Sequence, residues 1–370
     1  MARIIMKSIS KTYPEFDVIA VKDFNLEISK NEIIAFLGPS GCGKTTALRM
    51  ITGLEKISEG ELFIDGTNMT NAEPKDRGTA MVFQDFALFP HMTVYENIAF
   101  GLKPDVLTES EIKEKVDRIA GMGSIDIVHL YERKPNQLSN GQRQRVALAR
   151  ALMKEHKIIL LDEPFSNLDL KLRSTMRTEL KKLHQKIGTT FIFVTHDQQE
   201  AMSVADRIVI MSDGIIQQIG TPEMLYYSPC NVFTAGFLGN PQMNFWDTVV
   251  SNKNGEFYIS CGGMQIKLPA LKAGKADKYI GNEIIAGIRP ENIYVDEASQ
   301  NKFKTSVIDA KVKTSMFFGR ERQLCLSVGE GEFNVCVPPD IDVKADNINK
   351  IAFDAEKVYL FDKVTGRTLV

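Results

Sequence analysis

Runs of apolar residues alternate with amphipathic stretches through roughly the first two-thirds of the chain. Residues 33–37, 158–161 and 191–195 are almost entirely apolar, as expected for strands buried on both faces. A glycine-rich turn and a helical pattern from about Lys44 follow the first run, and a charged helical pattern over 170–187 separates the other two. This alternation predicts an α/β domain with a parallel sheet covered by helices.

The hydrophobic pattern changes near Gly236. From Trp246 onward, short alternating runs are separated by turn-forming residues, and the runs 322–328 and 332–337 predict a hairpin. The pattern predicts an all-β domain, most simply a small OB-like barrel. We therefore predict two domains, 1–236 and 237–370.

Composition and charge add mainly exclusions to this picture. The formal net charge is −2, from 45 basic and 47 acidic side chains, so nothing in the charge favours a nucleic-acid partner. No apolar run approaches the roughly 20 residues of a membrane span, and the start of the chain lacks a secretory-signal pattern. The 5 cysteines show no CxxC spacing and are expected to be reduced thiols of a cytosolic protein.

A phosphate-binding pattern follows the first buried run. The sequence GPSGCGKT at 38–45 fits GxxxxGK[ST] and stands between a predicted strand and a predicted helix, as this motif requires. Glycines let backbone N–H groups surround phosphate oxygens, and the following helix directs its positive end toward them. Lys44 is expected to reach the β- and γ-phosphates and Thr45 to bind Mg²⁺. Because Cys42 lies beside Lys44 and a helix N-terminus, we also expect it to be a reactive thiolate.

Two carboxylates follow the apolar run 158–161. Their position at the end of a buried strand is where ligands bind in open α/β sheets. Asp162 suits the surroundings of Mg²⁺, and Glu163 is placed to polarise a water molecule that attacks the γ-phosphate. A structural alternative is that the two residues only begin a helix. Together with 38–45 they indicate a P-loop NTPase.

A further set of motifs narrows the prediction. The sequence LSNGQ at 138–142 resembles the signature of ABC ATPases, and Gln84, Asp169 and His196 complete the set of that family in the family's order. The resemblance covers the whole chain. It implies a head-to-tail dimer with ATP between the subunits and Mg²⁺ bound with the ATP.

The resemblance also implies a role for each motif residue. Glu163, His196 and Gln84 would be catalytic, and Thr45, Gln84 and Asp162 would bind the metal. Asp169 would reach across the dimer interface, and Tyr13 would stack on adenine, with Phe16 as the alternative. The residues expected to bind ATP in one subunit are Tyr13, Gly38, Pro39, Ser40, Gly41, Cys42, Gly43, Lys44, Thr45 and Thr46, and those contributed by the other subunit are Ser139, Asn140, Gly141 and Gln142.

The sequence departs from the family pattern at Asn140, where the family usually has glycine. Asparagine is the residue that best replaces glycine at positive φ, so we expect the turn to be retained. Its side chain is expected to affect the rate and not the role of the motif.

ABC ATPases of DNA repair and of translation are the alternative class. Repair members interrupt the ATPase domain with a long coiled coil, and translation members usually carry two ATPase domains, whereas this chain has one set of motifs and no heptads. Residues 84–98 resemble the importer pattern that leads into a helical subdomain, expected at about 86–155. An apolar groove there would hold a short helix of a membrane subunit; the candidates for its lining are Phe86, Leu88, Phe89, Tyr95 and Phe100.

The second domain resembles the TOBE-type regulatory domain of carbohydrate importers of the maltose and glycerol-phosphate type. The matching runs are 218–223, 237–244 and 287–292. The first and third also occur in importers of polyamines and inorganic ions, which remain an alternative; the second favours sugars. The implied partners are a second copy or a paralogous ATPase, two membrane-spanning permease subunits, indirectly an extracytoplasmic solute-binding protein, and a regulatory protein on the second domain. The implied location is the cytoplasmic face of the membrane.

Overall fold

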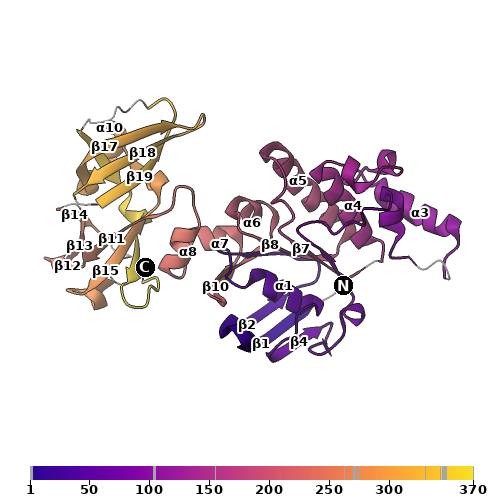
Figure 1. Cartoon of the computed structure of the whole chain (residues 1–370). Helices are drawn as coiled ribbons and strands as arrows, with labels where there is room; N and C mark the ends of the chain where they lie inside the picture. Colours follow the sequence, from indigo (N-terminus) through magenta and orange to yellow (C-terminus); the bar gives the residue numbers. More distant parts are fainter. Residues whose placement is uncertain are drawn as a thin grey trace. The chain divides into compact units, whose positions relative to one another are not determined.

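A computed structural model describes residues 3–102, 106–154, 156–261, 263–269, 272, 274, 276–329, 331–341, 343 and 348–369. Its contacts divide the chain into unit 1, Met1–Pro222, and unit 2, Glu223–Val370 (Figure 1). The domain boundary that the sequence predicts, 236/237, falls inside unit 2 on this division. The reason is that Ala235 is buried in one apolar cluster with Met243 and Phe361, both of unit 2.

The larger sheet of unit 1 has six strands in the order β10-β9-β3-β8-β7-β6. The strands from β9 to β6 run parallel, and β10 is antiparallel at the edge. β3, β7 and β8 are buried along their whole length, which confirms the buried parallel sheet that the apolar runs predict. The strands are β3 (Ile33–Leu37), β6 (Thr79–Val82), β7 (Ile158–Asp162), β8 (Thr190–Thr195), β9 (Arg207–Ser212) and β10 (Ile215–Gly220).

A second, antiparallel sheet of unit 1 has the order β2-β1-β4-β5. Helix α1 (Lys44–Thr52) lies between this sheet and the six-stranded sheet (Figure 1). One apolar core joins buried residues of both sheets and of α1, so the helix that follows the P-loop is fixed from two sides. The strands are β1 (Ile4–Tyr13), β2 (Val18–Ile28), β4 (Glu59–Ile64) and β5 (Thr67–Asn68).

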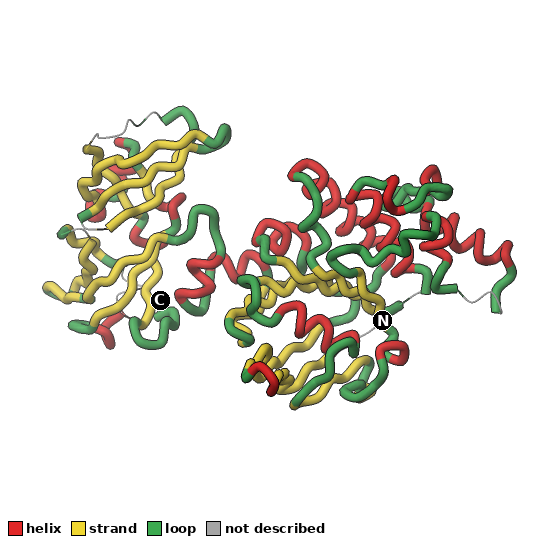
Figure 2. Tube along the Cα trace, viewed as in Figure 1, coloured by secondary structure: helices red, strands yellow, loops and turns green. Residues whose placement is uncertain are grey.

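The other helices of unit 1 begin at polar caps. The side chains of Thr93, Thr108 and Ser139 each accept a hydrogen bond from the backbone N–H three residues on. The glutamate or glutamine at that position accepts a hydrogen bond from the backbone N–H of the cap residue. Helices α5 and α6 lie on the opposite side of the six-stranded sheet from α1 (Figures 1 and 2). The helices are α2 (Val94–Ala99), α3 (Glu109–Ala120), α4 (Asn140–Leu152), α5 (Leu170–Ile187) and α6 (Gln198–Val204). None of the described helices combines the length and the apolar character that a membrane crossing requires.

Unit 2 begins with two short helices, α7 (Pro222–Tyr227, whose first residue closes unit 1) and α8 (Val232–Phe237), and continues as antiparallel sheets. The sheet orders are β11-β15-β21, β12-β13-β14 and β16-β20-β17-β18-β19. One helix, α10 (Glu297–Lys302), follows β16. The strands are β11 (Asn244–Val249), β12 (Ser251–Lys253), β13 (Glu256–Cys261), β14 (Met264–Lys267), β15 (Glu283–Ile288), β16 (Ile293–Tyr294), β17 (Val307–Phe317), β18 (Arg322–Val328), β19 (Gly331–Val337), β20 (Ile348–Phe353) and β21 (Tyr359–Asp362).

The predicted hairpin of unit 2 is confirmed. β18 and β19 pair in antiparallel register from Arg322 opposite Val337 to Val328 opposite Gly331. Alternate side chains of both strands are buried, because successive residues of a strand point to opposite faces of the sheet. The buried residues join a single apolar core with those of the other sheets, which is the all-β domain that the alternating runs predict.

Candidate active site

The loop between β3 and α1 has a conformation that only glycine permits at two positions. A Cβ atom on Gly38 would lie 2.2 Å from the carbonyl oxygen of Met211, and one on Gly43 would lie 2.2 Å from that of Ala20. Gly43 also has φ +96°, in the left-handed region. The glycine spacing of the motif therefore reflects a tight backbone turn pressed against neighbouring segments.

Lys44, the first residue of α1, is only 5% exposed. Its amino group donates hydrogen bonds to the carbonyl oxygens of Gly38, at 2.8 Å, and Pro39, at 2.7 Å. Lys44 has no carboxylate partner among the ion pairs of the described residues. The Lys44 ammonium group is therefore bound only by neutral carbonyl oxygens of the loop. An anion in the loop would bind this group more strongly than these oxygens do.

Cys42 does not have the environment that the sequence predicts for it. Cys42 is 5% exposed, with its sulfur 3.7 Å from the Lys44 amino group. Burial raises the pKa of Cys42, and this effect outweighs the lowering by Lys44. The prediction that Cys42 is a reactive thiolate is wrong, because it considered the nearby Lys44 cation and not the loss of hydration of the buried thiol.

Thr45 and Asp162 meet at the end of β7. The Thr45 hydroxyl donates a 3.0 Å hydrogen bond to Asp162 Oδ1. Asp162 is 6% exposed, and burial raises the pKa of its carboxyl group. Among the described residues, no group of three or more His, Cys, Asp and Glu side chains is arranged to hold a metal ion. One carboxylate with a hydroxyl suits Mg²⁺, which keeps several waters and substrate oxygens as ligands, and a cation would favour the charged form of the buried carboxyl.

The three residues predicted to be catalytic come from three strand ends and meet at one carboxylate. Glu163 Oε2 accepts a 3.2 Å hydrogen bond from the Gln84 amide, and Glu163 Oε1 lies 3.4 Å from Nδ1 of His196. The backbone of Glu163 has φ +46°, and its N–H donates to Val194 of β8. This turn aims the side chain between Gln84, after β6, and His196, after β8.

Asn167 is a site residue that the sequence analysis did not single out. Its amide donates a 3.0 Å hydrogen bond to the backbone oxygen of Gln84. A hollow of about 420 Å³ beside it is lined by Gln84, Asp162 and Arg49, among others. Its place in the run Ser-Asn-Leu-Asp that ends at Asp169 was the only available signal.

The signature residues begin α4. Ser139 is the N-cap, and its N–H donates a 3.0 Å hydrogen bond to the Gln142 side chain. A Cβ on Gly141 would come within 2.7 Å of Leu172 in α5, so a side chain there would displace this leucine. In the part of the chain that the structure describes, the hydrogen bonds of 139–142 lead to α4 itself and to Asn167, and none leads to the P-loop.

Asn140 does not have the positive φ that we expected from its replacement of glycine. It is the first residue of α4 and is absent from the residues with φ in the left-handed region. Its side-chain amide donates a 2.8 Å hydrogen bond to the backbone oxygen of Asn167. Asn167 in turn donates to the backbone oxygen of Gln84, so two hydrogen bonds link Asn140 to Gln84, one of the residues predicted to be catalytic. Asp169, two residues beyond Asn167, is exposed and caps α5.

The two candidates for adenine stacking differ in their surroundings. Tyr13 ends β1, and its hydroxyl is within hydrogen-bonding reach of Glu55 and Thr46; burial and Glu55 raise the pKa of Tyr13. Lys11 Nζ lies 4.7 Å from the centre of the Tyr13 ring. Phe16 is 73% exposed. The contact with Thr46 connects Tyr13 to the helix that follows the P-loop.

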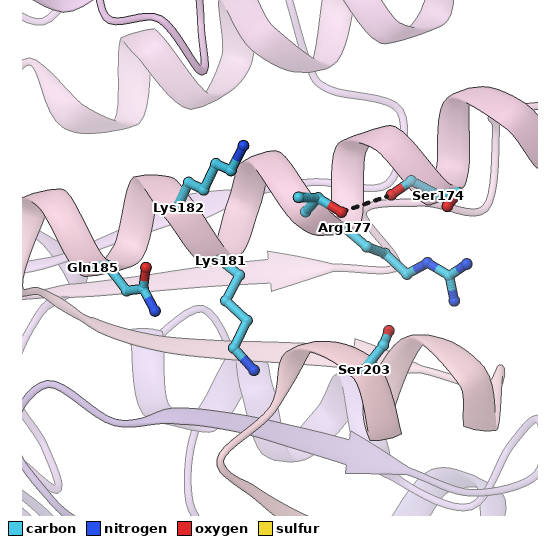
Figure 3. Close-up of a pocket in the computed structure, with 7 residues that line it drawn as sticks. Ser174, Arg177, Lys181, Lys182, Gln185 and Ser203 are labelled. Carbon is cyan, nitrogen blue, oxygen red and sulfur yellow. Dashed lines mark hydrogen bonds between the residues drawn. The ribbon is translucent and has the colours of Figure 1, made fainter.

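A basic hollow lies on α5, beyond the residues just described. It is lined by Arg177, Lys181 and Lys182 of α5 and by Ser203 of α6. Figure 3 shows Arg177 and Lys181 on the side of α5 that faces α6, and Lys182 pointing away from α6. It contains no acidic lining residue and none of the motif residues.

The parallel sheet, the P-loop and the strand-end carboxylates define a P-loop nucleotide-hydrolysing protein. Family models match at two places, "ABC transporter" over residues 21–166 and "MalK OB fold domain" over residues 239–293. The chain is 45% identical to the oligosaccharides import ATP-binding protein MsmX of Bacillus subtilis, and 43% identical to the multiple sugar-binding transport ATP-binding protein MsmK of Streptococcus mutans, covering 99% of both chains in each pair.

Solved structures agree with these matches. The dimeric structure of MJ0796, a bacterial ABC transporter cassette, is 34% identical, with a TM-score of 0.54 over 59% of this chain and 98% of the other. A post-hydrolysis dimer of MJ0796 bound to ADP and phosphate is 33% identical, with a TM-score of 0.52 over the same shares. The chain therefore belongs to the ATP-binding proteins of ABC transporters and carries a MalK-type OB-fold domain. The family and the fold predicted from sequence are both confirmed, and the protein is an ATPase.

Proposed function

We propose that this chain is the ATPase subunit of an importer for sugars. The observation that carries the proposal is the convergence of Gln84 and His196 on Glu163, next to the pair formed by Thr45 and Asp162. The full-length similarity to MsmX and MsmK, which are named for oligosaccharide import and multiple sugar-binding transport, supports a sugar as the solute.

The P-loop would bind the phosphates of ATP. Backbone N–H groups of 38–46 and the N-terminus of α1 would surround the β- and γ-phosphates. The Lys44 amino group would turn from the carbonyl oxygens of Gly38 and Pro39 to the phosphates, because a charged acceptor binds it more strongly than a neutral one. The Tyr13 ring, which lies near Thr46, would stack on the adenine.

Thr45, Asp162 and Gln84 would hold the magnesium ion that accompanies ATP. Bound there, the ion would neutralise charge on the phosphates. Glu163 would accept a hydrogen bond from the attacking water and polarise it toward the γ-phosphate. Gln84 and His196 would fix the orientation of this carboxylate, and His196 would also contact the γ-phosphate.

Each ATP would lie between two copies of the chain. Ser139, Asn140, Gly141 and Gln142 of a second copy would face the γ-phosphate with the N-terminus of α4. This arrangement is supported by the absence of described hydrogen bonds between 139–142 and the P-loop of the same chain. Asp169, exposed at the start of α5, would reach the opposite site.

The chain would work at the cytoplasmic face of the membrane with two permease subunits, which receive solute from an extracytoplasmic binding protein. An apolar surface supports the permease contact, since Phe100 is 56% exposed and its ring centre lies 4.3 Å from that of Phe89, with the two rings tilted. Phe86 is buried and belongs to the core. Unit 2 would contact its twin and a regulatory protein.

Uptake measurements test the solute. Cells that lack the gene should lose ATP-dependent uptake of labelled oligosaccharides and regain it with the intact chain but not with Lys44→Ala. Uptake of spermidine and of phosphate in the same cells should be unchanged. Loss of polyamine or ion uptake with normal sugar uptake would refute the sugar assignment and favour the alternative importer.

A further inference from the structure

The largest hollow among those described in the structure lies within unit 2, outside all the ATPase motifs. It measures about 500 Å³, and its lining comes from segments far apart in the sequence. These are the end of α7, the single residue Lys272, the turn after β15, and the turn that leads into β21. We call it the Arg289 pocket; the lining residues that matter here are Tyr227, Lys272, Arg289, Glu291, Glu356 and Tyr359.

Arg289 is a buried cation without a carboxylate partner among the described ion pairs. It is 1% exposed and donates hydrogen bonds to the backbone oxygens of Leu238, at 2.7 Å, and Tyr226, at 2.5 Å. The guanidinium also lies 3.5 Å from the centre of the Tyr226 ring, and its Nε is buried without a hydrogen-bond partner. Helix-end carbonyls and a ring face compensate a buried charge only partly.

Lys272 brings a second cation to the same hollow. Its amino group donates to the backbone oxygen of Val358 and lies 5.8 Å from the centre of the Tyr359 ring. Burial lowers the pKa of Lys272 to about 8, while Asp354 and Glu356 oppose this shift and Lys357 adds to it. The charge of Lys272 is therefore poorly compensated as well.

The acidic and aromatic side chains leave room for a ligand beside these cations. Glu291 is engaged by the Tyr226 hydroxyl at 2.6 Å, and the Tyr359 hydroxyl donates to the backbone oxygen of Tyr227 at 3.2 Å. The Tyr227 ring is 66% exposed. A pocket of this volume accepts a small organic molecule, and aromatic faces suit its uncharged part. The basic hollow of α5 differs, since it has no fully buried cation comparable to Arg289.

We propose that the Arg289 pocket binds a small organic anion through a phosphate or carboxylate group. Lys272 and Arg289 would bind the anionic group, and Tyr227 and Tyr359 would contact the rest of the molecule. Because Arg289 also holds the carbonyl ends of α7 and α8, the ligand would act on the segment that follows Pro222 and joins the ATPase unit to the β domain. The pocket would thus be a regulatory site, and its binding step does not depend on ATP hydrolysis.

Calorimetric titration of the full chain tests this proposal with three matched probes: glucose, glucuronate and glucose 6-phosphate. The titrations use the Lys44→Ala background, so that phosphate binding in the P-loop does not contribute. Binding of glucose 6-phosphate alone would assign a phosphate site, and binding of glucuronate alone a carboxylate site; binding of both also supports the proposal. It is overturned if neither anion binds by about 10 mM, or if glucose binds equally well.

Variants connect the binding to the pocket. Lys272→Met should weaken binding of the anionic probe at least about tenfold, because it removes one of the two cations assigned to the anionic group. Glu356→Gln should tighten it about twofold to threefold, since a repulsive carboxylate is removed. Lys278→Met, an exposed lysine that does not line the pocket, is the control and should leave affinity unchanged. Unchanged affinity in both Lys272→Met and Glu356→Gln would show that the anion binds elsewhere and would overturn the assignment.

Discussion

The active site of unit 1 and the Arg289 pocket of unit 2 are assembled from the chain in different ways. In the active site, eight consecutive residues form the P-loop, and Asp162 and Glu163 are adjacent. In the pocket, Tyr227 and Tyr359 are hydrogen-bonded although they are 132 residues apart in sequence. Phosphate binding by backbone N–H groups requires consecutive residues in one conformation, so it leaves a motif. A pocket made of charged side chains requires only that the fold brings these side chains together, so it leaves no motif in the sequence.

The two sites also contain desolvated groups of opposite charge. Asp162 is a buried carboxyl whose pKa is raised by burial, and Lys272 is a half-buried amine whose pKa is lowered by desolvation, to about 8. In both cases desolvation disfavours the charged form of the side chain, and a ligand of opposite charge would stabilise that form. This difference is consistent with the magnesium ion proposed for unit 1 and the anion proposed for unit 2.

Removing the catalytic charge should give the largest effect. Glu163→Gln should retain MgATP binding and lower the hydrolysis rate by about 10²- to 10⁴-fold, because the amide cannot polarise the attacking water. Steady-state phosphate release and nucleotide titration measure the two quantities. Glu73→Gln, an exposed glutamate, is the matched control. Near-normal turnover in Glu163→Gln would remove Glu163 from the mechanism.

Removing the buried arginine should mainly affect unit 2. Arg289→Ala eliminates two charged hydrogen bonds and should destabilise this unit by about 3 kcal/mol. Denaturation followed by the fluorescence of Trp246, the sole tryptophan, measures this loss. Arg320→Ala, on an exposed turn, should change little. If both variants unfold alike, Arg289 does not hold unit 2 together.

The buried P-loop thiol should react slowly. Since burial raises the pKa of Cys42, its thiolate fraction at neutral pH is smaller than that of a free thiol, and maleimide labelling should be about tenfold slower. The labelling rate should keep rising with pH beyond the ordinary thiol range of about 8.5. Mass spectrometry of the labelled peptide, with glutathione as the reference thiol, measures it. A labelling rate that stops rising below that pH would show that Cys42 is a reactive thiolate after all.

The adenine contact separates two neighbouring aromatic residues. Tyr13→Ala should weaken ATP binding about fivefold, equivalent to about 1 kcal/mol of stacking. Phe16→Ala should leave the affinity within a factor of about 2, because the ring is exposed and has no described contact with the P-loop helix. Equilibrium titration with a fluorescent ATP analogue compares the two. The reverse order of effects would make Phe16 the stacking residue.

The smallest effect is expected at the unusual signature residue. Asn140→Gly removes the hydrogen bond to Asn167 and should change the ATPase rate less than about threefold, because the helix cap at Ser139 remains. Gln137→Gly, exposed just before the motif, controls for added backbone freedom. A change of more than tenfold in Asn140→Gly alone would mean that this hydrogen bond sets the position of Gln84.

The parts of this protein that depend on local rules could be predicted from the amino-acid sequence. Apolar runs of strand length predicted β3, β7 and β8, because a strand buried on both faces has no polar positions. The glycines of the P-loop and the carboxylates after β7 could be assigned because their chemistry depends on spacing along the chain. Resemblance of the motifs to a known family supplied the family assignment, which the comparisons confirmed, and the residue roles, which remain predictions.

The behaviour of buried groups and the contacts between residues distant in sequence depend on the three-dimensional fold. The Cys42 pKa, the helical conformation of Asn140 and the Asn167 link to Gln84 all depend on neighbours from other segments. The Arg289 pocket depends on them entirely, since its cations and rings come from separate turns of unit 2. Desolvation and hydrogen bonding act through space, so a pattern along the chain does not contain them.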